Sequence, residues 1–290
     1  ADVIKLASNE NPLGPSAQVR AVLSAAVAGD NLSLYPDGSG HRLKQKLSAL
    51  HDIATDRITL GNGSNDLIEL LGRVFLGSGR AALFSEHAFA VYSIITQAQD
   101  ARAVVVPARA ASDAQPYGHD LEAFSRKLSA NADVALVFIA NPNNPTGTVL
   151  TPEAIETFLT RMPSDVIVAL DEAYYEYMDP ALRGPSRAWL DRFPNLIVFR
   201  TFSKAYGLAG LRIGYSLSSA ALADVLNRVR QPFNNNSLAL LAAEAALDDA
   251  DYVARSVELN TRERARLSAT LRGLGLTVLP SQANFLAIDF

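Results

Sequence analysis

One lysine of the sequence lies in surroundings that favour covalent chemistry. Lys204 follows an apolar run at residues 196–200, and a segment rich in glycine and small apolar residues leads from it to Arg212. A lysine is usually a solvated surface charge, but a position between a buried strand and a glycine-rich turn gives it little reason to face water. A nearby cation would lower the pKa of the Lys204 amine, so that neutral amine is available to attack a carbonyl carbon.

An aspartate stands at the end of another apolar run. Asp171 follows residues 166–170, and Tyr174 comes three positions later. A carboxylate at the exit of a buried strand requires a cation or several hydrogen-bond donors. Taken alone, Asp171 is more typical of a helix N-cap.

Two further turns follow apolar runs and offer backbone amides. Gly61-Asn-Gly-Ser-Asn-Asp66 comes after residues 57–60 and precedes an apolar helix, so it could hold an anion at a helix start. Asn141-Pro-Asn-Asn-Pro-Thr-Gly147 follows residues 134–140. Taken alone, each turn is also explained as an ordinary cap or a tight loop set by proline and glycine.

The elements that must position these segments follow an α/β pattern. Short runs rich in Val, Ile and Leu alternate with segments of helical period, which is typical of parallel strands joined by crossover helices. The last run follows its predecessor after only a short loop, so it could pair antiparallel at an edge of the sheet. The pattern predicts one large, mainly parallel seven-stranded sheet with helices on both faces; its strands are 57–60, 81–84, 103–106, 134–140, 166–170, 196–200 and 212–217.

The remainder of the chain predicts a smaller second layer. Helices are expected at 220–230, 237–247 and 251–274, and two strands at 277–279 and 283–290, whereas residues 1–16 are too polar and proline-rich for a core. The expected domains are an N-terminal arm and small-domain part at 1–28, a large domain at 29–245 and a small α+β domain at 246–290.

The composition excludes several classes of function. The 290 residues are 49% apolar and 19% charged, as in a folded globular protein, and the formal charge of -4 gives no general attraction to nucleic acid or anionic membranes. The absence of cysteine excludes disulfides and a thiol nucleophile, and four scattered histidines form no metal pair. With no signal or membrane-spanning segment, we expect a cytoplasmic protein without nucleic-acid, membrane or metal partners.

The four polar segments indicate a common binding site when they are considered together. In open α/β sheets ligands bind beyond the carboxyl ends of the strands, so all four are expected at one edge of the sheet. A lysine, an aspartate, an asparagine with a tyrosine, an arginine and a helix-start cradle are what pyridoxal 5'-phosphate (PLP) requires. The lysine would form the imine, the aspartate would keep the pyridine nitrogen protonated, and the arginine and cradle would neutralise the phosphate.

The motifs resemble a known family. Thr201-Phe-Ser-Lys-Ala-Tyr-Gly-Leu-Ala-Gly-Leu-Arg-Ile-Gly-Tyr215 is similar to the lysine signature of the fold-type I PLP-dependent (class I/II) aminotransferases, and the Asn141 and Asp171 motifs stand in that family's order. Ser8-Asn-Glu-Asn-Pro12, Tyr35-Pro-Asp37 and the Gly61 turn resemble the histidinol-phosphate aminotransferase branch. The resemblance covers nearly the whole chain.

The resemblance implies catalytic roles for three residues. Lys204 would carry the PLP Schiff base and move the proton between the substrate α-carbon and C4′ of the cofactor. Asp171 would pair with the ring nitrogen, and Tyr174 would bind the ring oxygen together with Asn144. In this family such residues act on a small-molecule amino donor and a 2-oxo acid.

The resemblance also implies binding roles. Phe89 would stack on the cofactor ring, with Tyr92 as the alternative. The phosphate would be held by Ser64, Asn65, Thr201, Ser203 and Arg212. Substrate would be bound by Asn11, Tyr35 and Asn144, and Tyr35 is expected to reach the cofactor of the other subunit in a homodimer with shared active sites. Family members carry substrate-binding arginines beyond residues 283–286, so we expect either that the small domain is truncated in this sequence or that this relative lacks the usual substrate clamp.

The leading hypothesis is an aminotransferase that moves an amino group between L-histidinol phosphate and 2-oxoglutarate, in histidine biosynthesis. An aromatic-amino-acid aminotransferase or a PLP-dependent decarboxylase of the same family is the first alternative. A non-catalytic PLP-binding module is the second, although no basic helix-turn-helix segment accompanies it. A dinucleotide-binding oxidoreductase rests only on the glycine turn at Gly61.

Overall fold

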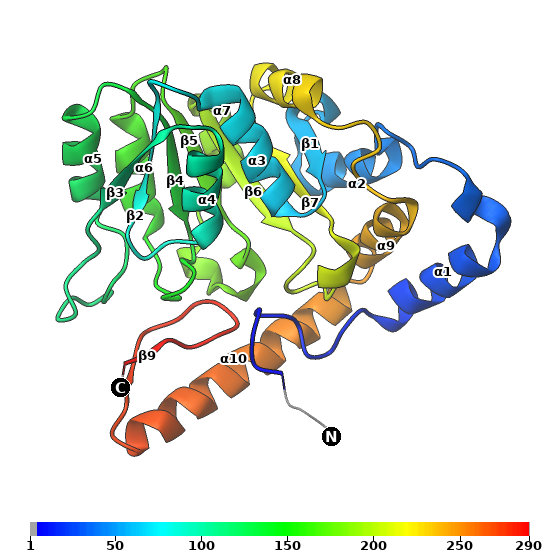
Figure 1. The fold of residues 1–290 in the computed structure, drawn as a ribbon. Coiled ribbons are helices and arrows are strands. Elements are labelled where there is room, and N and C mark those ends of the chain that lie inside the picture. Colours follow the sequence, from blue (N-terminus) through cyan, green and yellow to red (C-terminus); the bar gives the residue numbers. More distant parts are fainter. Residues whose placement is uncertain (1–4, 290) are drawn as a thin grey trace.

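A seven-stranded sheet forms the centre of the structure, which is a computed structural model describing residues 5–289 (Figure 1). Its strand order is β1-β7-β6-β5-β4-β2-β3. The strands are β1 (Ile58–Gly61), β2 (Ala81–Ser85), β3 (Arg102–Val106), β4 (Val134–Ala140), β5 (Ile167–Asp171), β6 (Leu196–Thr201) and β7 (Gly214–Leu217). All seven expected strands are present, and the α/β fold class is confirmed.

Strand direction follows the expectation with one difference. β3, β2, β4, β5 and β6 are parallel, and β7 is antiparallel to β6 as expected. The expected place of β7 at the edge was wrong, because β1 pairs antiparallel with its other side and forms the edge itself. A short loop sets the direction of a strand but does not decide whether a distant segment covers its free side.

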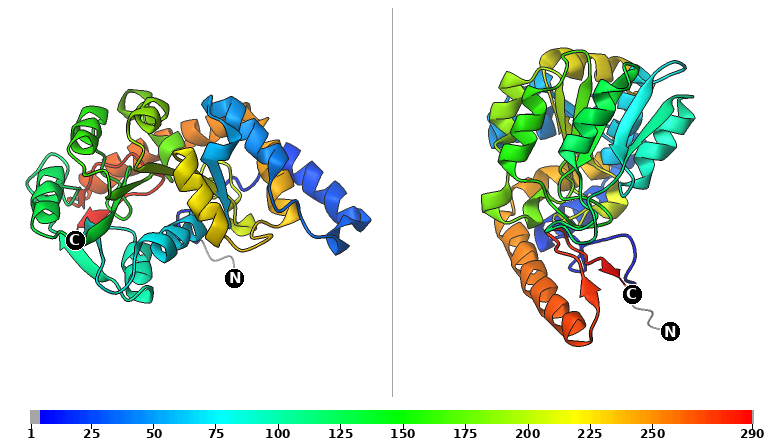
Figure 2. Two further views of the ribbon diagram at one scale, coloured as in Figure 1. Left: turned by 90° about the horizontal axis from the view of Figure 1, so that it is seen from above. Right: turned by 90° about the vertical axis from the view of Figure 1, so that its left-hand side faces the viewer.

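Helices cover both faces of the sheet (Figures 1 and 2). Successive side chains of a strand point to opposite faces, so β4 contributes Val137 and Ile139 to one core and Leu136 and Phe138 to the other. Because all seven residues of β4 are buried, its sequence is a continuous apolar run without polar alternation. This two-sided burial holds the strand ends rigidly in place.

The helices divide between the two cores. The core with Phe138 includes side chains of α3 (Ser64–Phe75), α4 (Ala90–Ala98) and α8 (Ala220–Val229). The core with Val137 includes side chains of α1 (Ala17–Ala28), α2 (His41–His51), α5 (Leu121–Ser129), α6 (Pro152–Thr160), α7 (Ser186–Arg192) and α9 (Ser237–Leu247). Side-chain caps start several of these helices; Ser16, for example, accepts a hydrogen bond from the amide of Val19. Single 3-10 turns lie at Asp30–Ser33, Thr55–Arg57, Tyr175–Tyr177, Pro180–Leu182 and Ala209–Leu211.

The last part of the chain leaves the sheet. The long helix α10 (Ala250–Gly273) projects away below the strands, and the N-terminal segment and the C-terminal loop lie near it in all three views (Figures 1 and 2). The first expected strand is one residue shorter, with β8 at Thr277–Val278, and the second is much shorter, with β9 at Ile288–Asp289. Residues 281–285 turn instead, since the Ser281 hydroxyl donates to the Phe285 carbonyl. The expectations for residues 1–4 and 290 lie outside the described residues.

The N-terminal segment is more closely packed than its composition predicts. Residues 5–16 form no helix or strand, yet Asn11 and Ser16 are buried. Within residues 5–289, none of the helices has the length and apolar character needed to cross a membrane.

Candidate active site

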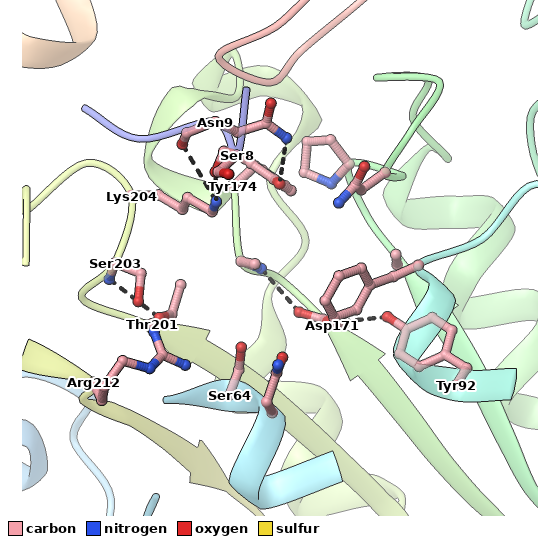
Figure 3. A pocket seen from close by; sticks show the side chains of 16 residues that line it. Ser8, Asn9, Ser64, Tyr92, Asp171, Tyr174, Thr201, Ser203, Lys204 and Arg212 are labelled. Carbon is pink, nitrogen blue, oxygen red and sulfur yellow. Dashed lines mark hydrogen bonds between the residues drawn. The ribbon is translucent and has the colours of Figure 1, made fainter. Parts of the chain in front are cut away.

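A cavity of about 350 Å³ lies at the carboxyl ends of β4, β5 and β6 (Figure 3). The last residues of these strands, Ala140, Asp171 and Thr201, all line it. The sheet register explains why, because Ala140 pairs with Asp171 in one ladder and Thr201 pairs with Gly214 in another. The other lining residues are Ser8, Asn9, Ser64, Asn65, Phe89, Tyr92, Pro142, Asn144, Ala173, Tyr174, Ser203, Lys204 and Arg212.

Lys204 points into this cavity from the loop after β6 (Figure 3). Its Nζ donates to the carbonyl oxygens of Ser8 at 3.1 Å and Asn9 at 3.3 Å, and it lies 5.4 Å from the centre of the Tyr174 ring. Burial lowers the pKa of Lys204, and the charge of Arg212 acts in the same direction, whereas the charges of Glu10 and Asp171 act against it. The amine is therefore more readily deprotonated than an exposed lysine, as nucleophilic attack requires.

Asp171 is 5% exposed at the end of β5. Its Oδ2 accepts a hydrogen bond from the Tyr92 hydroxyl at 2.8 Å, and its Oδ1 accepts one from the Ala173 amide at 3.2 Å. Burial raises the pKa of Asp171 to about 6, although both hydrogen bonds and the charge of Lys204 act against this rise. The carboxyl group can hold or release a proton near neutral pH.

Tyr174 lies beside the lysine with its hydroxyl group in the cavity region. The Asn9 side-chain amide donates to this hydroxyl at 3.1 Å, and the Tyr174 ring meets the Phe285 ring edge-on. Burial raises the pKa of Tyr174 to about 12, so the hydroxyl stays protonated and can donate a hydrogen bond. Asn144, from the turn after β4, lines the same cavity and makes no side-chain hydrogen bond to any residue of the range 5–289.

A cradle for an anion lies at the start of α3. Gly63 precedes the helix with φ of +81°, and a Cβ atom there would lie 2.9 Å from Cζ of Arg212 and closer still to Nη2. Gly214 is equally restricted, because a Cβ atom would meet the Ser64 amide nitrogen at 2.9 Å. These glycines let the guanidinium group and the helix amides approach one place, which is the arrangement that binds phosphate.

The hydroxyl and amide groups around this cradle are available. In the described part of the chain, the side chains of Ser64, Asn65 and Ser203 make no hydrogen bond, while the Thr201 hydroxyl accepts one from the Ser203 amide. The cavity therefore offers an amine, a carboxyl group and an anion cradle on its walls. This donor set fits PLP, which carries an aldehyde, a ring nitrogen and a phosphate.

Two aromatic residues of α4 lie at the cavity. Phe89 stands at the N-cap of α4 and is half-buried, and Tyr92 is completely buried three residues later. The Tyr92 ring stacks on Phe138, with 4.5 Å between ring centres and 4° between planes. Because that face is occupied, Phe89 is the better placed of the two to stack on a cofactor ring.

Two expected binding residues do not line the cavity. The Asn11 side chain donates to the Ala205 carbonyl and to the hydroxyls of Tyr252 and Ser256, so it ties the N-terminal segment to α10. The expected contact of Asn11 with substrate stays a prediction. Tyr35 is 82% exposed and stacks on Phe233 at 4.6 Å, away from the cavity residues.

The sequence interpretation missed three features of the site. Ser8 and Asn9 line the cavity beside Lys204, although the motif containing them was recognised and only Asn11 was selected from it. The hydrogen bond from Tyr92 to Asp171 joins residues 79 positions apart, and no local pattern indicates it. The buried ion pair between Arg200 and Glu172, 2.6 Å apart, lies directly behind the site; the charged residue inside an apolar strand was its one signal.

Comparisons with known proteins agree with this geometry. Residues 1–290 match the family of class I and II aminotransferases. The chain is 50% identical over 287 residues to histidinol-phosphate aminotransferase 1 of Idiomarina loihiensis, covering 99% of this chain and 76% of the relative. It is 53% identical over 289 residues to histidinol-phosphate aminotransferase 2 of Pseudomonas aeruginosa, covering 100% and 76%.

A solved structure is also similar over nearly the whole chain. The histidinol-phosphate aminotransferase of Sinorhizobium meliloti in complex with pyridoxal-5'-phosphate has a TM-score of 0.91 and 32% sequence identity, covering 97% of this chain and 74% of that one. The strand order, the lysine-bearing loop and these similarities together place the chain in the class I and II aminotransferase family.

Proposed function

We propose that this protein is a PLP-dependent aminotransferase that moves an amino group between L-histidinol phosphate and 2-oxoglutarate, in histidine biosynthesis. The observation that carries the proposal is that Lys204, Asp171 and Arg212 all line the same cavity. The names of relatives about 50% identical to this chain support the choice of substrate.

Binding of the cofactor is assigned to residues already at the cavity walls. PLP supplies an aldehyde that condenses with amines and a protonated ring that accepts electrons from the substrate. Lys204 is the amine that holds it, Asp171 faces the ring nitrogen, and Tyr174 and Asn144 bind the ring oxygen. Phe89 stacks on the ring, and the phosphate is held by Ser64, Asn65, Thr201, Ser203 and Arg212.

Two side chains handle protons in this proposal. With the cofactor bound, Lys204 Nζ would move the proton between the α-carbon of the substrate and C4′ of the cofactor, and its lowered pKa suits this alternation between base and acid. Asp171 Oδ1 and Oδ2 keep a negative charge near the ring nitrogen and so hold a proton there.

The N-terminal segment closes one side of the site. Ser8 and Asn9 contact Lys204, and the Asn284 side-chain amide donates to the Asn9 carbonyl at 2.9 Å. These residues reduce the access of water to the amine, which protects a reactive carbonyl from hydrolysis.

The proposal includes a cytoplasmic homodimer with shared active sites. Tyr35 is 82% exposed and stacks on Phe233, which is 45% exposed, and both rings would be covered if Tyr35 reached the site of a second subunit. Tyr35 would then contact substrate together with Asn144.

Borohydride reduction followed by peptide mapping tests the cofactor assignment. The purified protein is incubated with PLP and reduced, and a pyridoxyl adduct is expected on Lys204 in wild type and not in Lys204→Ala. Adducts spread over surface lysines, with none on Lys204, would contradict the assignment.

A half-reaction assay tests the substrate. Histidinol phosphate added to the holoenzyme without a 2-oxo acid should convert the cofactor's aldehyde absorbance to that of the amine form, and 2-oxoglutarate should reverse the change. Conversion by aromatic amino acids alone would indicate the alternative aminotransferase, and release of carbon dioxide would indicate a decarboxylase. Cofactor binding without any conversion would indicate a non-catalytic module.

A further inference from the structure

The Tyr92 hydroxyl donates a hydrogen bond to Asp171 (Figure 3), and aromatic side chains hold the Tyr92 ring in place. Tyr92 is 0% exposed, its ring stacks on Phe138, and Phe89 contacts it edge-on with 5.8 Å between ring centres. The hydroxyl oxygen lies 2.8 Å from Asp171 Oδ2. A side chain packed on its ring faces has little freedom to turn its hydroxyl elsewhere.

The direction of this hydrogen bond is fixed by chemistry. Burial raises the pKa of Tyr92 well above its ordinary value, so the phenol keeps its proton and donates. Asp171 Oδ1 is occupied in part by the Ala173 amide. Each carboxylate oxygen can accept two hydrogen bonds, so both retain a lone pair for a partner in the cavity.

Few other groups act on the Asp171 carboxyl group. Lys204 favours its charged form, the adjacent Glu172 disfavours it, and Tyr174 is the other titratable side chain nearby. Burial opposes the charged form most strongly. The Tyr92 hydroxyl is therefore the main hydrogen-bond donor that stabilises the carboxylate in a dry site.

We propose that Tyr92 is a positioning residue that keeps the Asp171 carboxylate charged and directed into the cavity, so that the proton between Asp171 and the cofactor's ring nitrogen stays on the nitrogen. The effect on the cofactor rests on the proposed function, whereas the hydrogen bond from Tyr92 to Asp171 does not depend on it. A carboxylate that accepts a hydrogen bond is a weaker base. Without Tyr92 the proton moves toward Asp171, and the ring becomes a poorer electron acceptor.

The test compares Tyr92→Phe with wild type in cofactor-free protein. The replacement keeps the aromatic ring and removes only the hydroxyl group. The pH titration of the ¹³Cγ signal of Asp171, identified by its loss in Asp171→Asn, should move upward by about one pH unit. An unchanged Asp171 titration in folded Tyr92→Phe would overturn the proposal.

Tyr215→Phe is the matched control. Tyr215 is also buried, and its hydroxyl bonds to His51 at 2.9 Å instead of to Asp171. This variant should leave the Asp171 titration unchanged; an equal shift in both variants would show a general effect of losing a buried hydroxyl and would also overturn the proposal. If Tyr92→Phe does not fold, 3-fluorotyrosine introduced at position 92 should lower the Asp171 pKa, because its more acidic phenol is a stronger donor.

The loaded enzyme provides a second readout. With ¹⁵N-labelled PLP, the ring nitrogen signal of Tyr92→Phe should shift toward the unprotonated form, and kcat should fall about tenfold with KM unchanged. If the Asp171 titration shifts in Tyr92→Phe but the wild-type protein does not transaminate, the proposed function is contradicted while the coupling between Tyr92 and Asp171 remains. A protonated ring nitrogen in both proteins would overturn the inference alone.

Discussion

Replacing Gly63 by alanine should weaken the binding of PLP much more than it lowers the stability of the folded protein. At this position φ is +81°, and the new Cβ atom would lie 2.9 Å from Cζ of Arg212, with Nη2 closer still. Carbon atoms that are not bonded prefer about 3.5–4.0 Å, so the guanidinium group must move away from the start of α3. The variant therefore disturbs the proposed phosphate cradle without removing any of its donors.

The magnitude follows from two separate costs. An alanine held at positive φ costs about 1–2 kcal/mol of folding free energy. Displacement of Arg212 would remove at least one of its proposed hydrogen bonds to the phosphate; one such bond is worth about 1.5–3 kcal/mol, which corresponds to about 10- to 150-fold weaker binding of PLP. Stability should fall modestly, and affinity for PLP should fall strongly.

Gly79→Ala is a control matched in backbone conformation. Gly79 also has φ of +81°, but an added Cβ atom there has nothing within 4 Å. Urea unfolding of the cofactor-free proteins should give similar losses of stability for both variants. Titration with PLP, followed by absorbance, should show weaker binding for Gly63→Ala only.

A double-mutant cycle with Arg212→Ala identifies the cause. In the Arg212→Ala background, Gly63→Ala should weaken PLP binding by less than threefold, since the displaced group is already absent. Equal PLP affinity of Gly63→Ala and Gly79→Ala, or full additivity in the cycle, would refute this reasoning about the cradle.

Three further perturbations give distinct outcomes. Arg200→Ala should cost about 3–5 kcal/mol in urea unfolding, because Glu172 stays buried without its partner; a loss below 1 kcal/mol would contradict this. The pKa of Asp171 is raised from 3.8 to about 6 on folding, so its charge destabilises the folded protein progressively as pH rises through this window. Asp171→Asn should therefore gain up to about 3 kcal/mol relative to wild type between pH 4 and pH 6, and parallel stability profiles would exclude that pKa. Mixed Tyr35→Ala and Lys204→Ala subunits should recover about a quarter of wild-type activity if sites are shared between subunits, whereas no recovery would indicate independent sites.

The sequence predicts most of the sheet because strands buried on both faces appear in it as continuous apolar runs. Val134–Ala140 is a continuous apolar run bounded by a turn, and the structure has a strand of the same extent. The exact ends of the strands are harder to predict from the sequence, since they depend on hydrogen bonds to distant residues and on the conformation of the adjoining loops. β5 extends to Asp171 because the Asn141 amide donates to the Asp171 carbonyl, and β7 begins only at Gly214 because Arg212 adopts φ of +60°.

The candidate site also contains residues that the sequence predicts and contacts that it does not. Residues at or shortly after the ends of strands, such as Asp171 and Lys204, can be predicted because a parallel sheet gathers its carboxyl ends at one edge. Asn9 meets Tyr174 across 165 positions of sequence. Such contacts depend on how the N-terminal segment packs over the sheet, and nothing in the local pattern specifies that path.

Asp171 and Glu172 are adjacent carboxylates at the end of β5, and they have different roles: one lines the cavity and the other forms a buried ion pair. Consecutive side chains point to opposite faces, so Asp171 lines the cavity while Glu172 accepts hydrogen bonds from Arg200 and Ser186. Glu172 thus has a fixed cation, whereas the donors of Asp171 are a neutral hydroxyl and an amide. A slip of one residue in the pairing of β5 would point Glu172 toward the cavity and separate it from Arg200, which lies on β6. The buried pair behind the site therefore favours the one register in which the carboxylate without a fixed cation faces the cavity.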